Sequence, residues 1–201
     1  SSTSCRPFLN RGWSGDSSLP DLLSICRGLR APDGVYAVLG NHEFMWSDRE
    51  CARHFESSGI RLMRNELTHL ARGNERVALI GMDNLFNQSM KSIERQLAEI
   101  RNRPDCILLQ HTPDMAPMID AEFRGLMLSG HTHGGQIILP LVGQAATASR
   151  FGLRYSAGLY PVGKGVMYVT RGVGAVGVPF RIGCPPEVTI LELSAETQAT
   201  G

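Results

Sequence analysis

The chain has 201 residues, of which 42% are hydrophobic and 19% charged, and these values indicate a soluble globular protein long enough to bury one substantial core. Lysine and arginine number 20 against 19 acidic residues, so bulk charge gives no reason to expect nucleic acid or an anionic membrane as the partner. The five cysteines are widely spaced without a Cys-x-x-Cys pair, which argues against a disulfide framework and a zinc finger. We expect reduced, mostly buried thiols.

We expect neither a transmembrane helix nor a signal peptide in this sequence. No apolar run approaches the roughly 20 residues that span a bilayer, and no charged region followed by an apolar one marks a signal peptide. We therefore expect a cytoplasmic protein or one that associates peripherally with a membrane, although the abrupt start in Ser1-Ser2-Thr3-Ser4 leaves the loss of a leading segment open. The expected organisation is an irregular segment over 1–17, one domain over 18–195 and a tail over 196–201.

The first third of the chain alternates helices with a strand. Leucines at helical spacing predict a helix over about residues 18–30, and a continuous apolar run predicts a buried strand over 35–39. A second helix is predicted over about 47–58, with Ser47 as its N-cap and Gly59 at its end.

The middle and end of the chain are richer in strands. Two β-like runs, 66–71 and 76–81, flank a short polar turn and predict a hairpin, and apolar residues at helical spacing predict a helix over about 88–101. Because helices and strands alternate first and strands dominate later, we expect an α/β layered fold with a mixed sheet. Further strands are predicted at 106–109, 126–128, 166–170 and 188–193.

Polar turns with metal-binding side chains follow three of the predicted strands. His131 and His133 lie in the glycine-rich turn after one strand, and imidazoles two residues apart at a strand end project to one side. Asn41 with His42 follows a second strand, and His111 follows a third. Ligands collect beyond the carboxyl ends of strands in open α/β sheets, so these turns can converge on one metal site although they are far apart in sequence.

The ordered set Gly40-Asn41-His42-Glu43, His111 and Gly130-His131-Thr132-His133 resembles the calcineurin-like metallophosphoesterase superfamily. Three further segments, 31–39, 158–160 and 183–187, are similar to its bacterial branch of single-domain, often membrane-associated phosphoesterases. The resemblance covers roughly residues 19–193. It implies a four-layer α/β/β/α sandwich and a hydrolase of phosphomonoesters or phosphodiesters, with lipid-linked nucleotides among the substrates of related proteins.

The resemblance also implies roles for individual residues. Asn41, His111 and His131 would bind one divalent ion, His133 would bind a second, and His42 would lie beside the scissile phosphate. Manganese, zinc or iron suits imidazole nitrogen and amide oxygen, and a pair of such ions about 3.5–4 Å apart activates water and binds a phosphate oxygen. His42 would then stabilise the transition-state charge or protonate the leaving oxygen.

The sequence departs from the family pattern near its start. The family's first motif is Asp-x-His, which occurs nowhere in this chain, and the single candidate for its Gly-Asp-x-x-Asp motif is Gly15-Asp16, without an apolar strand before it. We therefore expect a domain that is family-like from Leu19 onward, incomplete before it, and able to hold one ion rather than two. A truncated or degenerate domain that binds one metal or none and is not catalytic is the alternative function.

Other polar residues near predicted strand ends have structural as well as functional interpretations. The run Gly172–Gly177 fits Gly-x-Gly-x-x-Gly, but without a following helix we expect a loop near the site rather than a nicotinamide-nucleotide site. For Asp83 and Asn84 we expect either cleft-lining side chains or an Asx turn at the strand end, and for Asp114 a helix N-cap. Arg171 is expected either to contact phosphate or to be solvated or salt-bridged. His54 and His69 are expected to be structural or exposed.

Overall fold

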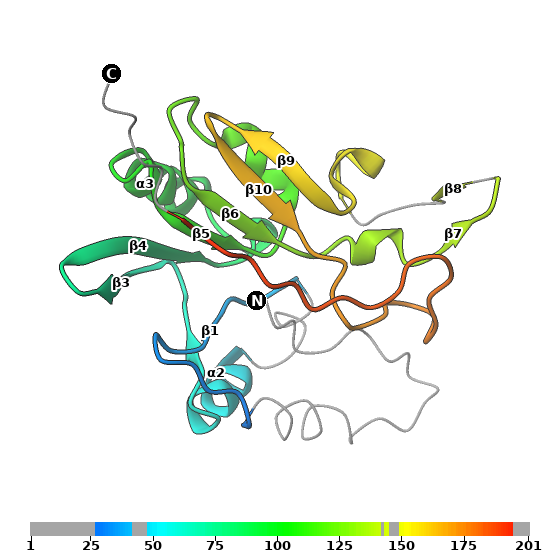
Figure 1. Ribbon diagram of the computed structural model, residues 1–201, viewed down its shortest axis with the longest axis horizontal. Helices are drawn as coiled ribbons and strands as arrows, with labels where there is room; N and C mark the ends of the chain where they lie inside the picture. Colours follow the sequence, from blue (N-terminus) through cyan, green and yellow to red (C-terminus); the bar gives the residue numbers. More distant parts are fainter. Residues whose placement is uncertain (1–26, 42–47, 142, 145–148, 195–201) are drawn as a thin grey trace.

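The computed structural model describes residues 27–41, 48–141, 143–144 and 149–194 (Figure 1). Several expectations fall outside these ranges: the helix over residues 18–26, the candidate ligand Asp16, the catalytic candidate His42, the cap Ser47 and both expected domain boundaries. The side chain of His54 also lies outside the described part.

A six-stranded mixed sheet forms the centre of the molecule. Its four inner strands, β4, β5, β6 and β10, are mutually parallel, and the edge strands β3 and β9 are antiparallel to their neighbours. Parallel inner strands end at the same edge, so the turns after them are brought together. In spatial order the strands are β3 (Glu66–Arg72), β4 (Glu75–Met82), β5 (Ile107–Gln110), β6 (Leu126–Ser129), β10 (Gly165–Val169) and β9 (Gly158–Val162).

A small βαβ unit precedes this sheet in the chain. Strand β1 (Tyr36–Ala37) pairs in parallel with β2 (Arg61–Leu62), and helix α2 (Asp48–Ser57) connects them. The longer helix α3 (Met90–Arg101) connects β4 to β5, and the Ser89 hydroxyl caps it by accepting from Ser92 N–H at 3.2 Å. The remaining elements are the short strands β7 (Ile138–Leu139) and β8 (Gly143–Gln144) and the 3₁₀ turns η2 (Leu85–Asn87), η3 (Pro113–Met118), η4 (His133–Gly135) and η5 (Gly152–Tyr155).

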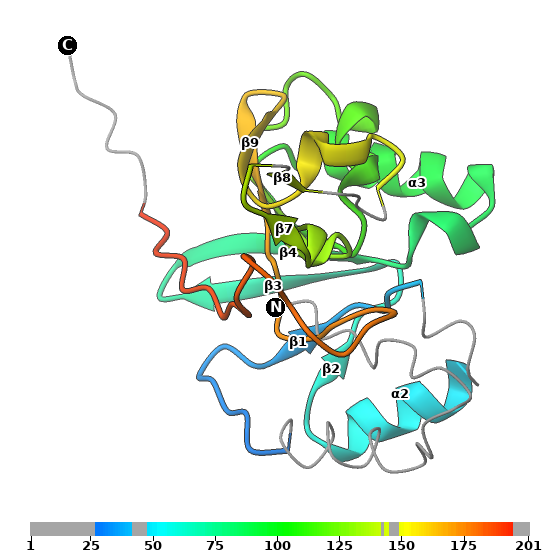
Figure 2. The same cartoon turned by 90° about the vertical axis from the view of Figure 1, so that its right-hand side faces the viewer.

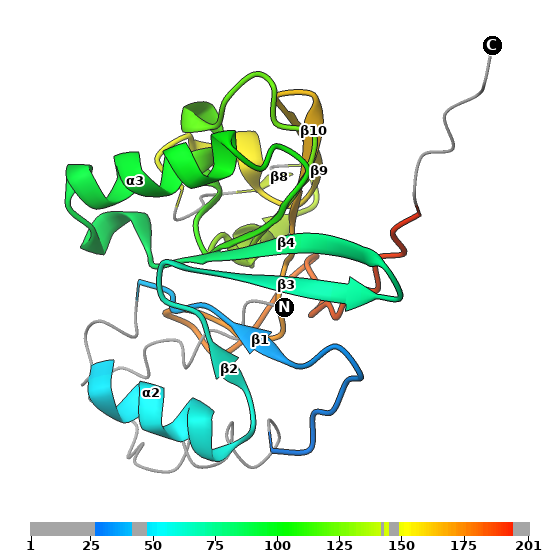
Figure 3. The same ribbon diagram turned by 90° about the vertical axis from the view of Figure 1, so that its left-hand side faces the viewer.

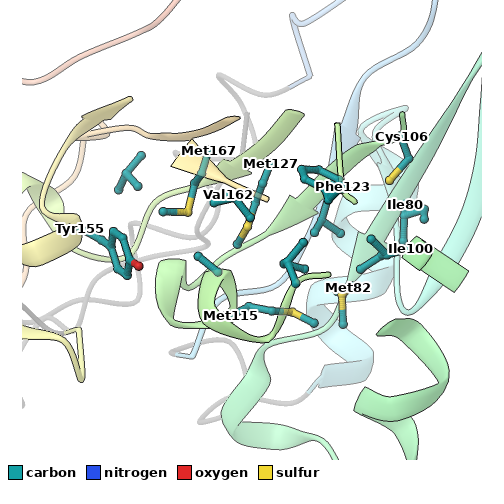
Figure 4. Close-up of a cluster of buried hydrophobic side chains, with 14 of the residues drawn as sticks. Ile80, Met82, Ile100, Cys106, Met115, Phe123, Met127, Tyr155, Val162 and Met167 are labelled. Carbon is teal, nitrogen blue, oxygen red and sulfur yellow. The ribbon is translucent and has the colours of Figure 1, made fainter. Parts of the chain in front are cut away.

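These elements stack in four layers, α3, the six-stranded sheet, the β1–β2 pair and α2, in that order (Figures 2 and 3). Each boundary between layers is a separate buried cluster. The largest lies between α3 and the sheet and is rich in methionine, whose flexible side chain fills irregular gaps (Figure 4). Its fully buried methionines are Met82, Met115, Met127 and Met167. The expected α/β/β/α arrangement is therefore confirmed.

The boundary between the two sheets depends on a close approach of backbones. Val38 and Met63 from the β1–β2 unit pack against Leu79 and Leu109 of the six-stranded sheet. Gly81 of β4 makes this contact feasible, because a Cβ atom there would lie 2.3 Å from the Cβ of Met63. The other side of the pair packs on α2 through Ala37, Leu39, Phe55 and Ile60.

Most predicted elements match the structure. The hairpin, α2 and α3 form where periodicity places them, and Gly59 follows α2 with φ of 73°. The prediction of a strand over 188–193 is wrong, because this segment has no regular secondary structure and does not pair with any described strand. The predicted helix over 18–30 is wrong at its end, where residues 27–30 form a turn and an irregular segment ahead of Pro32, which disfavours helical backbone in the residue before it.

The described cysteine side chains are buried, and the described helices fall short of what a membrane span requires. Cys106 and Cys184 are free thiols buried in the fold, as expected for reduced cysteines. Within the described ranges, the longest and most apolar helices remain too short or too polar to cross a membrane.

Candidate functional site

The candidate site lies where strands of both sheets end. His111 directly follows β5, His131 comes two residues after β6, and Asn41 comes four residues after β1 of the smaller sheet. Gly130 N–H donates to His111 O at 3.0 Å, which joins the turns that follow the neighbouring strands β5 and β6. The predicted convergence of separate strand ends is therefore realised for these three residues.

Three side-chain atoms form a nearly equilateral triangle. Asn41 Oδ1 lies 3.1 Å from His111 Nε2 and 3.0 Å from His131 Nδ1, and the two ring nitrogens are 3.2 Å apart. His111 is 5% exposed, whereas Asn41 and His131 are half-buried, so the triangle has a buried side and an accessible one. The two imidazoles meet edge to face, with ring centroids 5.0 Å apart.

The spacing of the triangle fits a divalent metal ion. An ion about 2.1 Å from each atom would see every pair at an angle of about 95°, which is the arrangement of three ligands on one face of an octahedron. Two imidazole nitrogens and one amide oxygen are a mixed set that borderline ions accept. Among the described residues no three His, Cys, Asp or Glu side chains cluster for metal binding, so the amide oxygen of Asn41 is what completes this set.

The turn that carries His131 holds left-handed backbone at residues other than glycine. His131 has φ of 70° and His133 has φ of 53°, a conformation that costs of order 1–3 kcal/mol for a residue with a Cβ. Thr132 stabilises the turn from its centre, because its hydroxyl donates to Ser156 O at 2.6 Å and accepts from Gly134 N–H. The fold thus fixes a strained turn in order to aim these rings.

His133 contacts a different segment from His131. Its Nδ1 lies 3.4 Å from Gly174 O in the glycine-rich loop 171–177. A carbonyl that accepts from one ring nitrogen selects the tautomer in which the other nitrogen, Nε2, acts as metal ligand, which is the usual arrangement for zinc-binding histidines.

Two polar side chains attach the glycine-rich loop to the histidine turn. Gln136 accepts from Val176 N–H and donates to the carbonyls of Val176 and Val178. Arg181 donates to His133 O at 3.0 Å, to Arg171 O at 2.7 Å and to Gly174 O. The loop therefore lies against the histidine turn, near the candidate site as the sequence predicts. No helix follows it within residues 171–194, which removes the nucleotide-binding interpretation.

An aromatic ring lies beside His131, and a guanidinium lies over that ring. Phe86, in the turn after β4, has its ring centroid 6.3 Å from that of His131. The guanidinium carbon of Arg150 lies 4.7 Å from the centroid of Phe86. The sequence carries no signal for either residue, because their contact spans 64 positions and depends on the sheet to bring β4 and the later loop together.

The other polar residues at strand ends have structural roles. Asn84 accepts from Phe86 N–H, which is the Asx turn, one of the two roles considered for it, and Asp83 forms an ion pair with Arg64 at 3.0 Å. Arg171 pairs with Glu187 at 3.5 Å. The prediction of Asp114 as an N-cap is wrong: Thr112 precedes the turn, and the buried Asp114 carboxylate accepts from Ser149 Oγ and Arg150 N–H.

The predicted site residues thus divide into three groups. Asn41, His111 and His131 come together within hydrogen-bonding distance. His133, two residues after His131 in the chain, contacts the glycine-rich loop instead. His42 is outside the described residues. His69, expected to lie away from any site, is exposed on the β3–β4 hairpin.

The chain is similar to several known bacterial proteins. Over 162 residues the chain is 35% identical to the phosphodiesterase YaeI of Escherichia coli, a match that covers 79% of this chain and 58% of that protein. Over 177 residues it is 32% identical to the uncharacterized metallophosphoesterase YkuE of Bacillus subtilis, covering 87% and 61%. An uncharacterized metallophosphoesterase of Aquifex aeolicus is 29% identical over 185 residues, covering 89% and 68%.

The chain spans about three fifths of the length of the first two relatives. No family model and no solved structure matches it. Three relatives from distant bacteria, similar over most of this chain, nevertheless carry the name metallophosphoesterase, the family that the motif order suggests, and YaeI is named a phosphodiesterase. The chain belongs to the calcineurin-like metallophosphoesterase superfamily.

Proposed function

We propose that this protein is a metal-dependent hydrolase of phosphate esters. The observation that carries the proposal is the triangle of Asn41 Oδ1, His111 Nε2 and His131 Nδ1, because its three sides match the spacing of ligands around one divalent ion. Relatives named phosphodiesterase and metallophosphoesterase support the same reaction class.

The candidate ligands would bind ions at two positions. Asn41, His111 and His131 would hold one ion, and His133 would contribute Nε2 to a second. A divalent ion bound here supplies Lewis-acid polarisation of a phosphate oxygen and lowers the pKa of a bound water. Manganese, zinc and iron all accept this set of nitrogen and oxygen ligands.

The remaining chemistry falls to side chains around the triangle. His42 follows Asn41 directly in the chain, and we propose it as the residue beside the scissile phosphate that donates a proton to the leaving oxygen. The glycine-rich loop, attached by Gln136 and Arg181, limits the space beside His133. Phosphomonoesters and phosphodiesters are the proposed substrates, with lipid-linked nucleotides and peripheral membrane association as narrower forms of the proposal.

A second candidate function is a non-catalytic domain that binds a single ion. The observation that favours it is the difference between the two halves of the site: three ligand atoms meet at the triangle, whereas His133 contacts the glycine-rich loop. The number of bound ions separates the two candidates, because hydrolysis by a two-metal route requires both sites to fill.

The test combines metal content with turnover. Purified protein is loaded with Mn²⁺, bound metal is measured by mass spectrometry, and hydrolysis of bis(p-nitrophenyl) phosphate and p-nitrophenyl phosphate is followed by absorbance. We expect bound metal and turnover in the wild type. His131→Ala should weaken metal binding at least about 100-fold, because the triangle loses one of three ligands.

His69→Ala is the matched control, since it removes an exposed imidazole from the hairpin. It should leave both metal content and turnover unchanged. A wild type that binds metal without turnover supports the single-ion candidate, and one whose metal content survives His131→Ala contradicts the proposed site.

A further inference from the structure

Phe86 links Arg150 to the candidate ligand His131. Phe86 lies tilted against His131, and the guanidinium of Arg150 covers the Phe86 ring on the protein surface. Phe86 is 40% exposed and Arg150 is exposed, so both are accessible from solvent.

Arg150 is held in place through its backbone. Its N–H donates at 3.0 Å to the carboxylate of Asp114, which is 4% exposed, and the neighbouring Ser149 hydroxyl donates to the same carboxylate. Asp114 itself lies three residues after the candidate ligand His111. A buried carboxylate beside the site therefore fixes the main chain at Arg150, while the guanidinium projects from it.

The guanidinium group of Arg150 has different contacts from those of other arginines on the surface. The described guanidinium groups that pair with carboxylates include those of Arg61, Arg72, Arg101 and Arg124. Within the described ranges Arg150 has no carboxylate partner for its side chain and contacts the face of Phe86. A guanidinium stacked on a ring keeps its N–H edge available, and that edge matches two oxygens of a phosphate or carboxylate.

We propose that Arg150, supported by the face of Phe86, binds an anionic group of the phosphate ester substrate beside the metal site. The proposal rests on the proposed hydrolase function and adds to it a residue for substrate binding that lies outside the metal ligands. The anion is either the scissile phosphate itself or a second anionic group of the same substrate, because both present paired oxygens to the guanidinium.

The experiment measures anion binding to the Mn²⁺-loaded protein by calorimetry. In both probes a phosphonate group is the analogue of the scissile phosphate. Methylphosphonate has this group alone, and 3-phosphonopropionate also has a carboxylate. We expect Arg150→Ala to weaken binding about tenfold, since a charge-assisted contact is lost. Loss for both probes assigns Arg150 to the scissile phosphate, and loss for 3-phosphonopropionate alone assigns it to the second anionic group.

Arg154→Ala is the matched control. Arg154 is also exposed and also lies over a ring, with its guanidinium carbon 5.2 Å from the centroid of Tyr155. Tyr155, however, packs against Phe151 and Tyr160 rather than against a histidine. Removing this charge should leave the affinity of both probes unchanged. Arg150→Lys should restore part of the affinity, because a cation remains without the planar edge.

The proposal is overturned if Arg150→Ala binds both probes as tightly as the wild type, or if Arg154→Ala weakens them equally. Binding is measured separately from turnover, so failure of the hydrolase proposal is distinguishable. If the hydrolase proposal fails, the wild type binds the phosphonates without hydrolysing esters. The comparison with Arg150→Ala still shows whether anion binding depends on Arg150. Asp114 contacts Arg150 through the backbone N–H and not through the side chain. The substitutions at Arg150 should therefore leave the fold intact, which circular dichroism checks.

Discussion

At the scale of single residues, left-handed backbone is concentrated beside the candidate ligands. His131, His133 and Gln136 adopt φ between 53° and 70°, and Gly134 and Gly135 complete the run. Each residue with a Cβ atom costs of order 1–3 kcal/mol in this conformation. Side-chain bonds from Thr132 and Gln136 offset that cost. The turn is consequently sensitive to small changes in its glycines.

Gly134→Ala should destabilise both the turn and the metal site. A Cβ atom at Gly134, where φ is 62°, would lie 2.7 Å from Arg171 Cγ and from Cys184 Sγ, so strain and crowding add. We expect a loss of about 2–4 kcal/mol in the free energy of unfolding and weaker Mn²⁺ binding. Urea denaturation and metal titration measure the two effects.

Gly73→Ala provides the comparison for that prediction. Gly73 has φ of 59° in the β3–β4 hairpin, and a Cβ there would meet no atom within 4 Å. This variant should lose only about 1 kcal/mol, from backbone strain alone, and should bind metal normally. Equal effects of the two substitutions would contradict the role assigned to crowding at the turn.

The residues found from sequence and those missed differ in a physical way. Asn41, His111 and His131 each follow an apolar strand, so local pattern and the rule on strand ends suffice to bring them together. Phe86 and Arg150 meet only through tertiary packing, and no local pattern marks a ring-to-guanidinium contact. The convergence of these three candidate ligands was therefore predictable from sequence, whereas their surroundings required the fold.

At the scale of elements, Arg181 determines how the glycine-rich loop sits against the histidine turn. Arg181→Ala should free the carbonyls of His133, Arg171 and Gly174 together, because one guanidinium binds all three. We expect a loss of about 2–4 kcal/mol of stability and faster amide hydrogen exchange over residues 172–177. Hydrogen exchange followed by mass spectrometry detects the local change.

Arg124→Ala is the control for the loop. Arg124 forms an exposed ion pair with Asp105, and such pairs contribute about 0–1 kcal/mol. Its removal should leave exchange over the glycine-rich loop unchanged. If Arg181→Ala also leaves that exchange unchanged, the loop is held by Gln136 alone.

Glu187 attaches the C-terminal segment to β10 and should make it sensitive to acid. Partial burial would raise the pKa of Glu187, but hydrogen bonds from Tyr168 and Thr189 and the charge of Arg171 outweigh it, and the pKa lies below its usual value. A lowered folded-state pKa contributes stability that is present above the unfolded value of about 4.3 and is lost as pH falls through the folded one.

Glu187→Gln should therefore lower stability at pH 7 by about 1 kcal/mol and reduce the difference from wild type below pH about 4. Thermal unfolding of both proteins from pH 7 to pH 3 measures this. Asp105 and Asp120, whose pKa values are also lowered, remain in both proteins and cancel in the comparison. A stability difference that stays constant with pH would contradict the assignment.

Secondary structure was predictable where periodicity was long or apolar. The β3–β4 hairpin and α3 carry such patterns over seven residues or more. Strand β9 has no comparable signal, because it is a five-residue edge strand that contains Pro161, and proline is tolerated only at such edges. Residues 188–193 have a strand-like pattern, but a strand also needs a neighbour, which the described sheets do not provide.

At the scale of the whole molecule, the candidate site joins the two sheets. Asn41 follows the smaller sheet, whereas His111 and His131 follow strands of the larger one. The packing of Met63 on Leu79 and Leu109 therefore positions Asn41 relative to the histidines, although none of these apolar side chains is a ligand. Metal affinity and packing between the sheets should be thermodynamically linked.

This linkage predicts the behaviour of Met63→Ala. Met63 is fully buried, so the substitution should cost about 2–5 kcal/mol, and the looser boundary between the sheets should weaken Mn²⁺ binding as well. Met90→Ala, at a methionine that is 62% exposed on α3, should change neither. Excess Mn²⁺ should raise the unfolding temperature of the wild type in proportion to the logarithm of its concentration, since it binds the folded state. In Met63→Ala that rise should begin at a higher Mn²⁺ concentration; an identical onset in both proteins would mean that the larger sheet binds the ion without Asn41.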